Sequence, residues 1–178
     1  MRDRPGGKGC GTGGAVGDTG AVIERFEQLR TGRLLLEPMS DAVASGIARG
    51  DLSGLATAEG WPQSGTKNGV ALALERGQPP GWLVRHAGRV IGDCGIHAPV
   101  DAAGCVEIGY GLAAGYHGQG LGTEMVAAMS DWLLSRADVS TVRARTLPSN
   151  VASGRVLEKA GFVQVASSDE LRVYERKA

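Results

Sequence analysis

The chain has 178 residues, with 19 basic and 19 acidic side chains, a formal net charge of zero and three cysteines. The length favours one domain with a substantial core, and the balanced charge argues against a nucleic-acid-binding surface, which needs a basic surplus. No apolar run is long enough for a membrane span, no secretory signal is evident, and Cys10, Cys94 and Cys105 lack metal-ligand spacing. We therefore expect a cytoplasmic protein with no metal, and with neither nucleic acid nor a membrane as partner.

The first 30 residues predict a flexible, glycine-rich tail before a domain at residues 31–178. Met1–Gly20 has almost no large apolar side chain, so it cannot bury enough surface to offset the entropy lost on ordering. A G-x-G-x-x-G pattern begins at Gly9, but no strand precedes it, and the dinucleotide-binding motif therefore lacks its context. Ala21–Leu29 could form a short helical turn ahead of the domain.

The expected elements before residue 100 are a strand, two helices and a hairpin. The strand carries three consecutive leucines, a glycine and two prolines stop the second helix, and the hairpin turns at an Ala-Gly pair. The strand is Arg33–Glu37, the helices are Asp41–Arg49, with Asp41 as its cap, and Thr66–Arg76, and the hairpin strands are Trp82–His86 and Arg89–His97.

The strand Cys105–Leu112 has two different faces, because side chains alternate along a strand. One face carries large apolar side chains and Tyr110. The other carries Glu107 and two glycines, Gly109 and Gly111. A face with so little side-chain volume leaves room for a ligand or for another backbone to lie close.

A glycine-rich turn follows this strand over Ala113–Gly122, and a helix is expected from about Thr123 to Ser135 or Arg136. Glycine lets the backbone approach a ligand closely, and the free N–H groups of a helix start attract anions. Because four glycines in eight residues exceed what a tight turn needs, we interpret the segment as a phosphate-binding loop. It is neither a P-loop, which needs a lysine after the last glycine, nor a dinucleotide fingerprint, whose glycine spacing differs.

The remaining elements are a strand, a helix and a closing hairpin. Asn150 or Ser149 caps the helix and Gly161 ends it. The strand is Ser140–Leu147, the helix runs to Ala160, and the hairpin strands are Phe162–Ala166 and Leu171–Arg176. The order of elements predicts an α+β (mixed α/β) fold with one crossover between parallel strands.

Three segments, in this order, resemble the GNAT superfamily of N-acetyltransferases. The run from His117 to Gly122, HGQGLG, is similar to that family's coenzyme A pyrophosphate loop, Gln/Arg-x-x-Gly-x-Gly/Ala, with His117 at the first position. Two further segments resemble the Rim-type branch, the ribosomal-protein N-terminal acetyltransferases: NVASGRVLEKAGF, Asn150–Phe162, and TGRLLLEPMSD, Thr31–Asp41. Together the segments span about residues 31–176.

The resemblance implies a fold, a cosubstrate and an assembly. The fold is a mostly antiparallel sheet of about seven strands, flanked by four helices, whose splayed central strands admit the pantetheine arm of acetyl-CoA. The two helices before the hairpin would form a wall of the acceptor site, and a homodimer is implied. The coenzyme-binding residues would be Leu112, Ala113, His117, Gly118, Gln119, Gly120, Leu121, Gly122, Thr123, Asn150, Ser153 and Arg155.

Acetyl transfer to an amine needs a base, because most primary amines are protonated at neutral pH. Glu107 is the candidate base, since it lies on the strand that leads into the loop, where the family often places this group; a paired surface carboxylate is an equally good interpretation. His97 is the alternative, because histidine titrates near neutrality, and Asp93 on the same face could orient it. Trp61 and His97 could also shape the acceptor pocket.

The thiolate that leaves coenzyme A needs a proton donor, and the developing oxyanion needs a hydrogen bond. The resemblance implies Ser153 for the first role, unless its hydroxyl bonds its own helix backbone, and the Leu112 N–H for the second. Tyr110 and Tyr174 are alternative proton donors.

The sequence therefore predicts an acetyl-CoA-dependent N-acetyltransferase that acts on a primary amine of a small molecule or a protein N-terminus. Transfer is expected to be direct, in a ternary complex, because no Cys-His pair suited to an acyl-enzyme is evident. A non-catalytic acyl-CoA-binding regulatory or interaction domain is the alternative, and a nucleotide-binding protein is a third interpretation.

Overall fold

The computed structural model describes residue 23 and residues 25–178, so most of the predicted tail lies outside the described residues. The elements in chain order are β1 (Leu29–Arg30), β2 (Leu34–Pro38), α1 (Asp41–Arg49), α2 (Ser64–Glu75), β3 (Trp82–His86), β4 (Arg89–Ile96), β5 (Cys105–Leu112), a short 3-10 turn (Ala114–Tyr116), α3 (Leu121–Leu134), β6 (Thr141–Thr146), α4 (Val151–Lys159), β7 (Val163–Ser167) and β8 (Arg172–Lys177).

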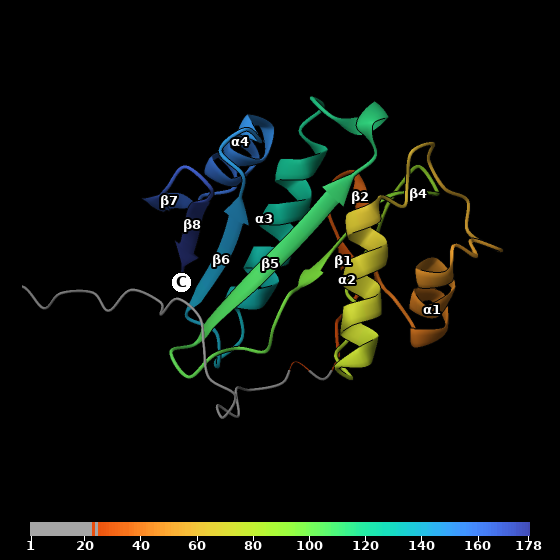
Figure 1. Ribbon diagram of the computed structural model, residues 1–178, viewed down its shortest axis with the longest axis horizontal. Helices are drawn as coiled ribbons and strands as arrows, with labels where there is room; N and C mark the ends of the chain where they lie inside the picture. Colours follow the sequence, from red (N-terminus) through yellow and green to blue (C-terminus); the bar gives the residue numbers. More distant parts are fainter. Residues whose placement is uncertain (1–22, 24) are drawn as a thin grey trace, which may run out of the picture.

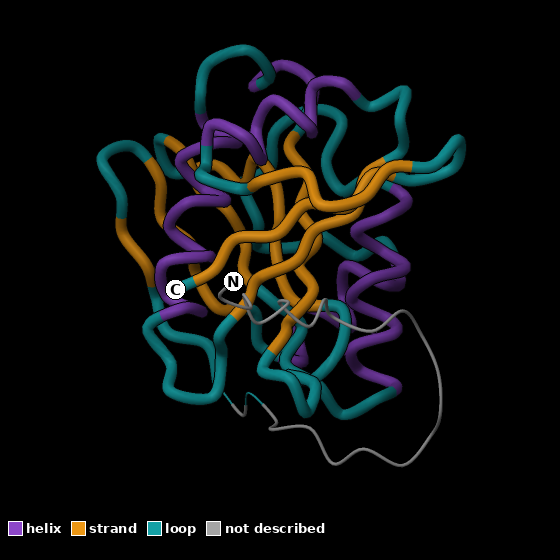
Figure 2. Tube along the Cα trace, turned by 90° about the vertical axis from the view of Figure 1, so that its left-hand side faces the viewer, coloured by secondary structure: helices purple, strands orange, loops and turns teal. Residues whose placement is uncertain are grey.

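Within the described residues, eight strands form one sheet in the order β1-β2-β3-β4-β5-β6-β8-β7, and among these strand pairs only β5–β6 is parallel. Helices α1 and α2 pack together on one face of the sheet, while α3 and α4 lie on the other (Figures 1 and 2). The expected mixed, mostly antiparallel fold with four helices is thereby confirmed. The eighth strand is β1, whose two residues become a strand only by pairing with β2.

The central strands β5 and β6 separate partway along their length. They pair over Cys105–Ile108 and Thr141–Ala144, and past that point β5 leans away from β6 (Figure 1). This is the splay expected at the centre of the sheet. Among the strands, the last four residues of β5 therefore pair with β4 alone.

The register with β4 decides which backbone groups of β5 face the gap. The N–H of Ala113 donates to the carbonyl of Ile91 at 2.8 Å, and the N–H of His97 donates to the carbonyl of Glu107 at 2.9 Å. In an antiparallel pair, hydrogen-bonded and non-hydrogen-bonded residues alternate. The N–H groups of Tyr110 and Leu112 therefore point away from β4 and into the gap.

The packed domain begins earlier than our boundary at residue 31. Ile23 and Phe26 are buried, and the Phe26 and Trp82 ring centroids lie 4.0 Å apart. The Trp82 Nε1 donates to the carbonyl of Glu27 at 2.7 Å. These contacts hold residues 25–28 as irregular chain, so the expected helical turn is not formed over them; Ala21, Val22 and Glu24 lie outside the described residues. Only a tertiary partner fixes this segment, which is why the sequence pattern did not mark it.

Helix boundaries depart from expectation by one or two residues, for identifiable reasons. Ser40, and not Asp41, caps α1, because its hydroxyl accepts from the Val43 N–H at 3.3 Å. Helix α3 starts at Leu121, since Gly120 takes the cap position in the left-handed region at φ 77°. In the described part of the chain, no helix has both the length and the apolarity that crossing a membrane requires.

Candidate active site

A cavity of about 640 Å³ lies between α2 and the sheet, a volume within the range of small-molecule sites. Small residues form part of its lining: Gly65, Gly69 and Ala73 from α2, and Gly109 and Gly111 from β5. The cavity therefore lies on the face of β5 that carries Gly109 and Gly111, where the sequence predicted space for a ligand. It continues past the separated strands to the end of β6 and the start of α4.

The glycine-rich loop ends in an open helix start. Gly118 and Gly120 have φ of 74° and 77°, a region that side chains disfavour. Among the described residues, no side chain caps α3, so the N–H groups of Leu121, Gly122 and Thr123 are left for an external acceptor. Such a helix terminus attracts anions, and a diphosphate fits this chemistry.

The polar side chains of the loop brace its own backbone. The His117 Nε2 lies 2.9 Å from the Leu112 carbonyl oxygen, which can only accept, so this nitrogen carries the proton. The Gln119 Nε2 donates to the Gly115 carbonyl at 2.9 Å. His117, which departs from the Gln/Arg of the family motif, thus joins the loop to the end of β5.

Arg33 and Glu124 attach the loop to β2, an attachment that sequence reasoning missed. The Arg33 Nη1 donates to the Gln119 carbonyl at 2.9 Å, and its Nε donates to Glu124 at 2.7 Å. Glu124 also accepts from the Arg33 N–H at 2.8 Å and from the Thr31 hydroxyl. Burial would raise the pKa of Glu124, but hydrogen bonds from Thr31 and Arg33 outweigh it and lower that pKa. The two partners are 91 residues apart in sequence, so no local pattern marks the pair.

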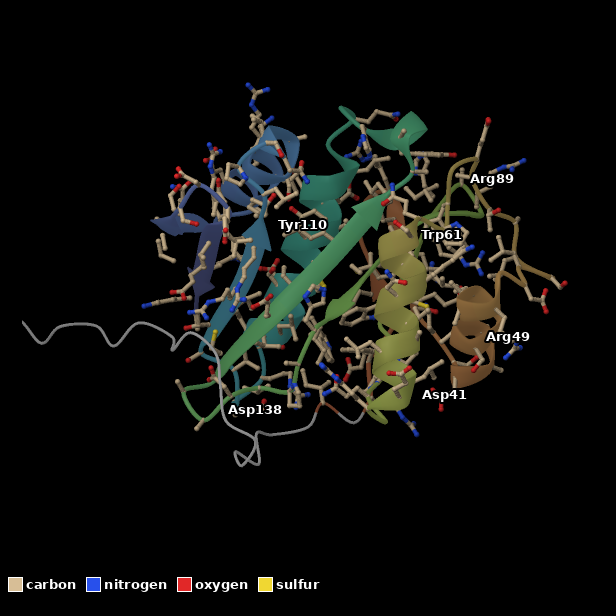
Figure 3. All side chains as sticks on the ribbon, in the orientation of Figure 1. Asp41, Arg49, Trp61, Arg89, Tyr110 and Asp138 are labelled. Atoms are coloured by element: carbon tan, nitrogen blue, oxygen red, sulfur yellow. The ribbon has the colours of Figure 1, made fainter. Side chains whose placement is uncertain are left out.

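Tyr110, Ser153 and Asn150 meet across the gap and line the cavity. The Tyr110 hydroxyl lies 2.8 Å from the Ser153 Oγ, and the Ser153 N–H donates to the Asn150 Oδ1 at 3.1 Å. Asn150 is thus the cap of α4, as expected, and Ser153 bonds a tyrosine across the gap. Figure 3 marks Tyr110 on β5 beside β6. Burial raises the pKa of Tyr110, so its hydroxyl stays protonated at neutral pH.

Tyr174, the other tyrosine considered as a proton donor, packs against Gly154 of α4, outside the cavity. It is buried, and its hydroxyl donates to the Gln164 Oε1 at 3.1 Å, in the C-terminal hairpin. It is not among the residues that line the cavity. Of the two alternative tyrosines, only Tyr110 is brought to the site.

Glu107, the predicted base, has both oxygens engaged. Its Oε2 lies 3.1 Å from the Arg145 Nε, and its Oε1 lies 3.6 Å from the His97 Nδ1, an ion-pair distance. The neighbouring His97 ring, and then the Arg145 guanidinium, lower the pKa of Glu107 against the opposing effect of burial. Glu107 itself does not line the cavity, whereas His97 and Arg145 do. The His97 ring covers Gly109, where a Cβ would overlap it.

Asp93, on β4, is bound by one residue of the segment that leads into α2 and one of α2 itself. Its Oδ1 accepts from the Trp61 Nε1 at 2.8 Å and from the Thr66 hydroxyl at 2.5 Å. Burial raises the pKa of Asp93, and the two hydrogen bonds offset part of that rise. The expectation that Asp93 orients His97 is not met, because the carboxylate beside His97 is Glu107. Trp61 is buried and does not line the cavity, so it bears on the site through Asp93 (Figure 3).

The other predicted coenzyme residues are placed as follows. Leu121 is buried, and the Ala113 N–H is already bonded to Ile91, so Ala113 has only its carbonyl to offer. The Leu112 carbonyl accepts from both His117 and Gln63, at 2.9 Å and 3.2 Å. Arg155 is exposed on α4, and its role toward a phosphate stays a prediction.

The sequence matches the family model described as "Acetyltransferase (GNAT) domain" over residues 33–163. An uncharacterized N-acetyltransferase, YjdG of Bacillus subtilis, is 31% identical over 83 residues, which cover 47% of this chain and 49% of the relative. The match to the p20 N-acetyltransferase of Bacillus licheniformis covers 51% of that relative, so the chain spans about half the length of these curated relatives.

Solved structures agree in fold. The acetyltransferase from Agrobacterium tumefaciens strain C58 is 26% identical with a TM-score of 0.61, covering 86% of this chain and 96% of that one. The RimL ribosomal L7/L12 alpha-N-protein acetyltransferase in complex with coenzyme A has a TM-score of 0.60, covering 85% of this chain and 98% of that one; at 19% identity it speaks to the fold alone. An open helix start beside a splayed sheet and a match over residues 33–163 lead to one conclusion: the chain belongs to the GNAT acetyltransferase family.

Proposed function

We propose that the protein is an acetyl-CoA-dependent N-acetyltransferase, which moves the acetyl group to a primary amine of a small molecule or a protein N-terminus by direct transfer. The observation that carries this proposal is that the open start of α3 and the cavity meet at the end of β5. The uncapped start of α3 follows directly on β5, and the roomy cavity reaches the gap beside the same strand. An anion site and an acceptor site thus adjoin one strand end.

In this proposal the coenzyme binds to backbone N–H groups that have no other acceptor among the described residues, at the start of α3 and along the gap. Its diphosphate binds the backbone of Gly118–Thr123, where the helix start is unoccupied by any described side chain. Its pantetheine arm runs through the gap, with the Tyr110 N–H and Asn150 within reach of its amides. The RimL structure of the same fold holds coenzyme A, which supports coenzyme A as the ligand proposed here.

The reaction then involves three protein groups around the thioester. The amine nitrogen attacks the carbonyl carbon, and the Leu112 N–H, which points into the gap, donates to the developing oxyanion. When the C–S bond breaks, the thiolate takes one proton from the hydrogen-bonded pair of Tyr110 and Ser153 hydroxyls, and the proton that the attacking nitrogen loses replaces it. Glu107, engaged with Arg145 and His97, holds these two side chains at the cavity wall.

The Rim-type branch, a protein N-terminus as acceptor, a homodimer and a cytoplasmic location are finer parts of the proposal. The NVASGRVLEKAGF segment supports the branch, since it supplies Asn150 and Ser153 to the gap. At the cavity wall, Leu72 and Leu147 are apolar and 42% and 60% exposed, which suits an acceptor with an apolar portion beside its amine. Acetylation assays on N-terminal peptides and sedimentation measurements test these parts.

The first test is the unfolding midpoint with and without acetyl-CoA, with ATP as the control. A ligand at about 100 times its dissociation constant stabilises the folded state by about 2.7 kcal/mol. For a domain of this size that amounts to roughly 5–10 °C. A shift with acetyl-CoA and none with ATP is expected, followed by thiol release with primary amines. A shift without turnover of any amine would favour the non-catalytic acyl-CoA-binding domain, and no shift would overturn the coenzyme assignment.

A further inference from the structure

Asp93 presents one bound oxygen and one free oxygen. Both hydrogen bonds from Trp61 and Thr66 go to its Oδ1, and none of the described residues donates to its Oδ2. Asp93 lines the cavity. The two hydrogen bonds to Oδ1 hold the carboxylate in place, and Oδ2 is left to accept a hydrogen bond from a ligand in the cavity. A partly buried acceptor of this kind calls for a donor supplied by a ligand.

The position of Asp93 places this carboxylate beside the expected reaction centre. Across the β4–β5 pair, its partner is Gly111, the residue before Leu112, whose N–H faces the gap. Paired residues of neighbouring strands direct their side chains to the same face, and Gly111 has none. A Cβ at Gly111 would lie 3.2 Å from the Gln63 Oε1, so glycine keeps the space between the carboxylate and the gap open.

The other carboxylate near the cavity is poorly suited to take a proton. Each oxygen of Glu107 faces a basic side chain, Arg145 or His97, and Glu107 does not line the cavity. Two partners of this kind stabilise its ionised form. Asp93 has neutral donors on one oxygen only, and its surroundings favour the protonated form more than water does.

We propose that Asp93 is the general base of the acetyl transfer, its Oδ2 receiving a hydrogen bond and then a proton from the acceptor ammonium. This inference rests on the proposed function. The neutral amine nitrogen forms a bond to the thioester carbon, and the C–S bond breaks. Tyr110 gives a proton to the sulfur, and the second proton lost by the nitrogen replaces it. The products are the N-acetyl amine, coenzyme A with a free thiol, and protonated Asp93, which returns its proton to water.

The test compares Asp93→Asn with Glu107→Gln in the full chain. Asparagine keeps an oxygen for Trp61 and Thr66 and loses the base, so the substitution is matched in shape. With n-butylamine, a primary amine with an apolar tail, kcat/KM is expected to fall about 100-fold or more in Asp93→Asn, within the range for loss of a general base. In Glu107→Gln, kcat/KM is expected to fall less than about 10-fold, because Glu107 acts only through its contacts with Arg145 and His97.

Two further readouts separate a base from a structural residue. The acid limb of the wild-type pH–rate profile should vanish in Asp93→Asn, and the acetyl-CoA-dependent shift of the unfolding midpoint should be kept. Hydroxylamine, a weakly basic amine that is largely unprotonated at the assay pH, needs no base, so its rate should fall much less than that of n-butylamine. A merely structural role would lower both rates alike.

Several outcomes would overturn the inference. Equal kcat/KM and pH profile in wild type and Asp93→Asn would do so, as would equal losses for the two amines. If the wild type acetylates neither amine, calorimetric titration of n-butylamine into the coenzyme A-saturated protein decides. The inference then requires binding by the wild type and at least 10-fold weaker binding by Asp93→Asn, a change of about 1.4 kcal/mol. Failure of the wild type to bind acetyl-CoA would instead overturn the proposed function.

Discussion

Tyr110 and Ser153 are two hydroxyls, 2.8 Å apart, contributed by different elements to one point of the gap. At the residue scale this pair shows what the sequence could and could not predict. The motif placed Ser153 at the site, whereas Tyr110 was only one of two alternative donors, because it stands on the apolar face of β5 and at no motif position. The role of Tyr110 follows from its contact with Ser153, which lies 43 residues later in the chain. No local sequence pattern predicts that contact.

If the pair acts as one proton donor, Tyr110→Phe and Ser153→Ala should each lower kcat by about 10- to 100-fold, at the low end of general acid effects because water can substitute. The KM for acetyl-CoA should change little, and the double variant should be no worse than the weaker single variant, since the two groups act together. Steady-state kinetics measure this. Tyr174→Phe, a matched change away from the cavity, should keep wild-type kcat; an equal loss there would contradict the assignment.

Asp93 and Glu107 should affect stability with opposite dependence on pH. The folded-state pKa of Asp93 is raised above its ordinary value of 3.8, so its favourable contribution is complete below that value and is lost as pH rises through the folded pKa. The unfolding free energy of the wild type minus that of Asp93→Asn should therefore decrease with rising pH, leaving the variant at least as stable at neutrality.

Glu107 supplies the control for that measurement. Its folded-state pKa is lowered from 4.5, so its contribution is present above that value and is lost as pH falls through the folded pKa. The unfolding free energy of the wild type minus that of Glu107→Gln should therefore increase with rising pH. Urea unfolding from about pH 2.5 to 7 tests both slopes, because the Glu107 contribution changes only below about pH 5, and parallel slopes for the two variants would rule out the assigned environments.

At the scale of elements, the coenzyme loop depends on one backbone conformation. Gly120 caps α3 at φ 77°, and a Cβ there would lie 3.4 Å from the Arg33 Nη2. Gly120→Ala should lower the unfolding free energy by about 1–2 kcal/mol and weaken acetyl-CoA binding, because a left-handed residue is strained and the N–H groups after it would turn away. Gly115→Ala, in open space with no positive φ, should change neither; unfolding curves and calorimetry compare the two.

The elements themselves were predictable wherever local chemistry sets their limits. Alternation and flanking glycines defined β5 as Cys105–Leu112, and Asn150 capped α4, both as expected. Elements that need a distant partner were missed: β1, which exists by pairing with β2, and the Arg33–Glu124 attachment. The same distinction holds for the site. The loop was predictable because its residues are contiguous in sequence, whereas the free oxygen of Asp93 was not, because it results from contacts with Trp61 and Thr66.

At the scale of the molecule, the splay divides the sheet into two parts. Strands β1–β5 form one part, and β6, β8 and β7 form the other, which the buried Arg143–Glu175 pair at 2.7 Å helps to hold together. Across the division, strand pairing is limited to Cys105–Ile108 and Thr141–Ala144. A coenzyme lying in the gap would contact both parts, so its binding should be visible in the backbone of each.

Amide hydrogen exchange tests this expectation. With acetyl-CoA at about 100 times its dissociation constant, the N–H groups of Tyr110, Leu112 and Leu121–Thr123 should exchange up to about 100-fold more slowly, because they gain acceptors in the complex. Amides of β2 and β3, distant from the gap, serve as the internal control. Equal protection of β3 would indicate global stabilisation alone, and unchanged exchange at Tyr110 and Leu112 would exclude the pantetheine path.

The small residues of α2 have a consequence for how this protein can change over generations. Gly65 and Gly69 face open space within a helix, where glycine is about 0.5–1 kcal/mol less favourable than alanine. A mutation from glycine to a larger residue there would reshape the acceptor cavity and strengthen the helix at once. Most adaptive substitutions in an enzyme cost stability, but a lineage of this protein could narrow its choice of acceptor by steps that also make the fold more robust.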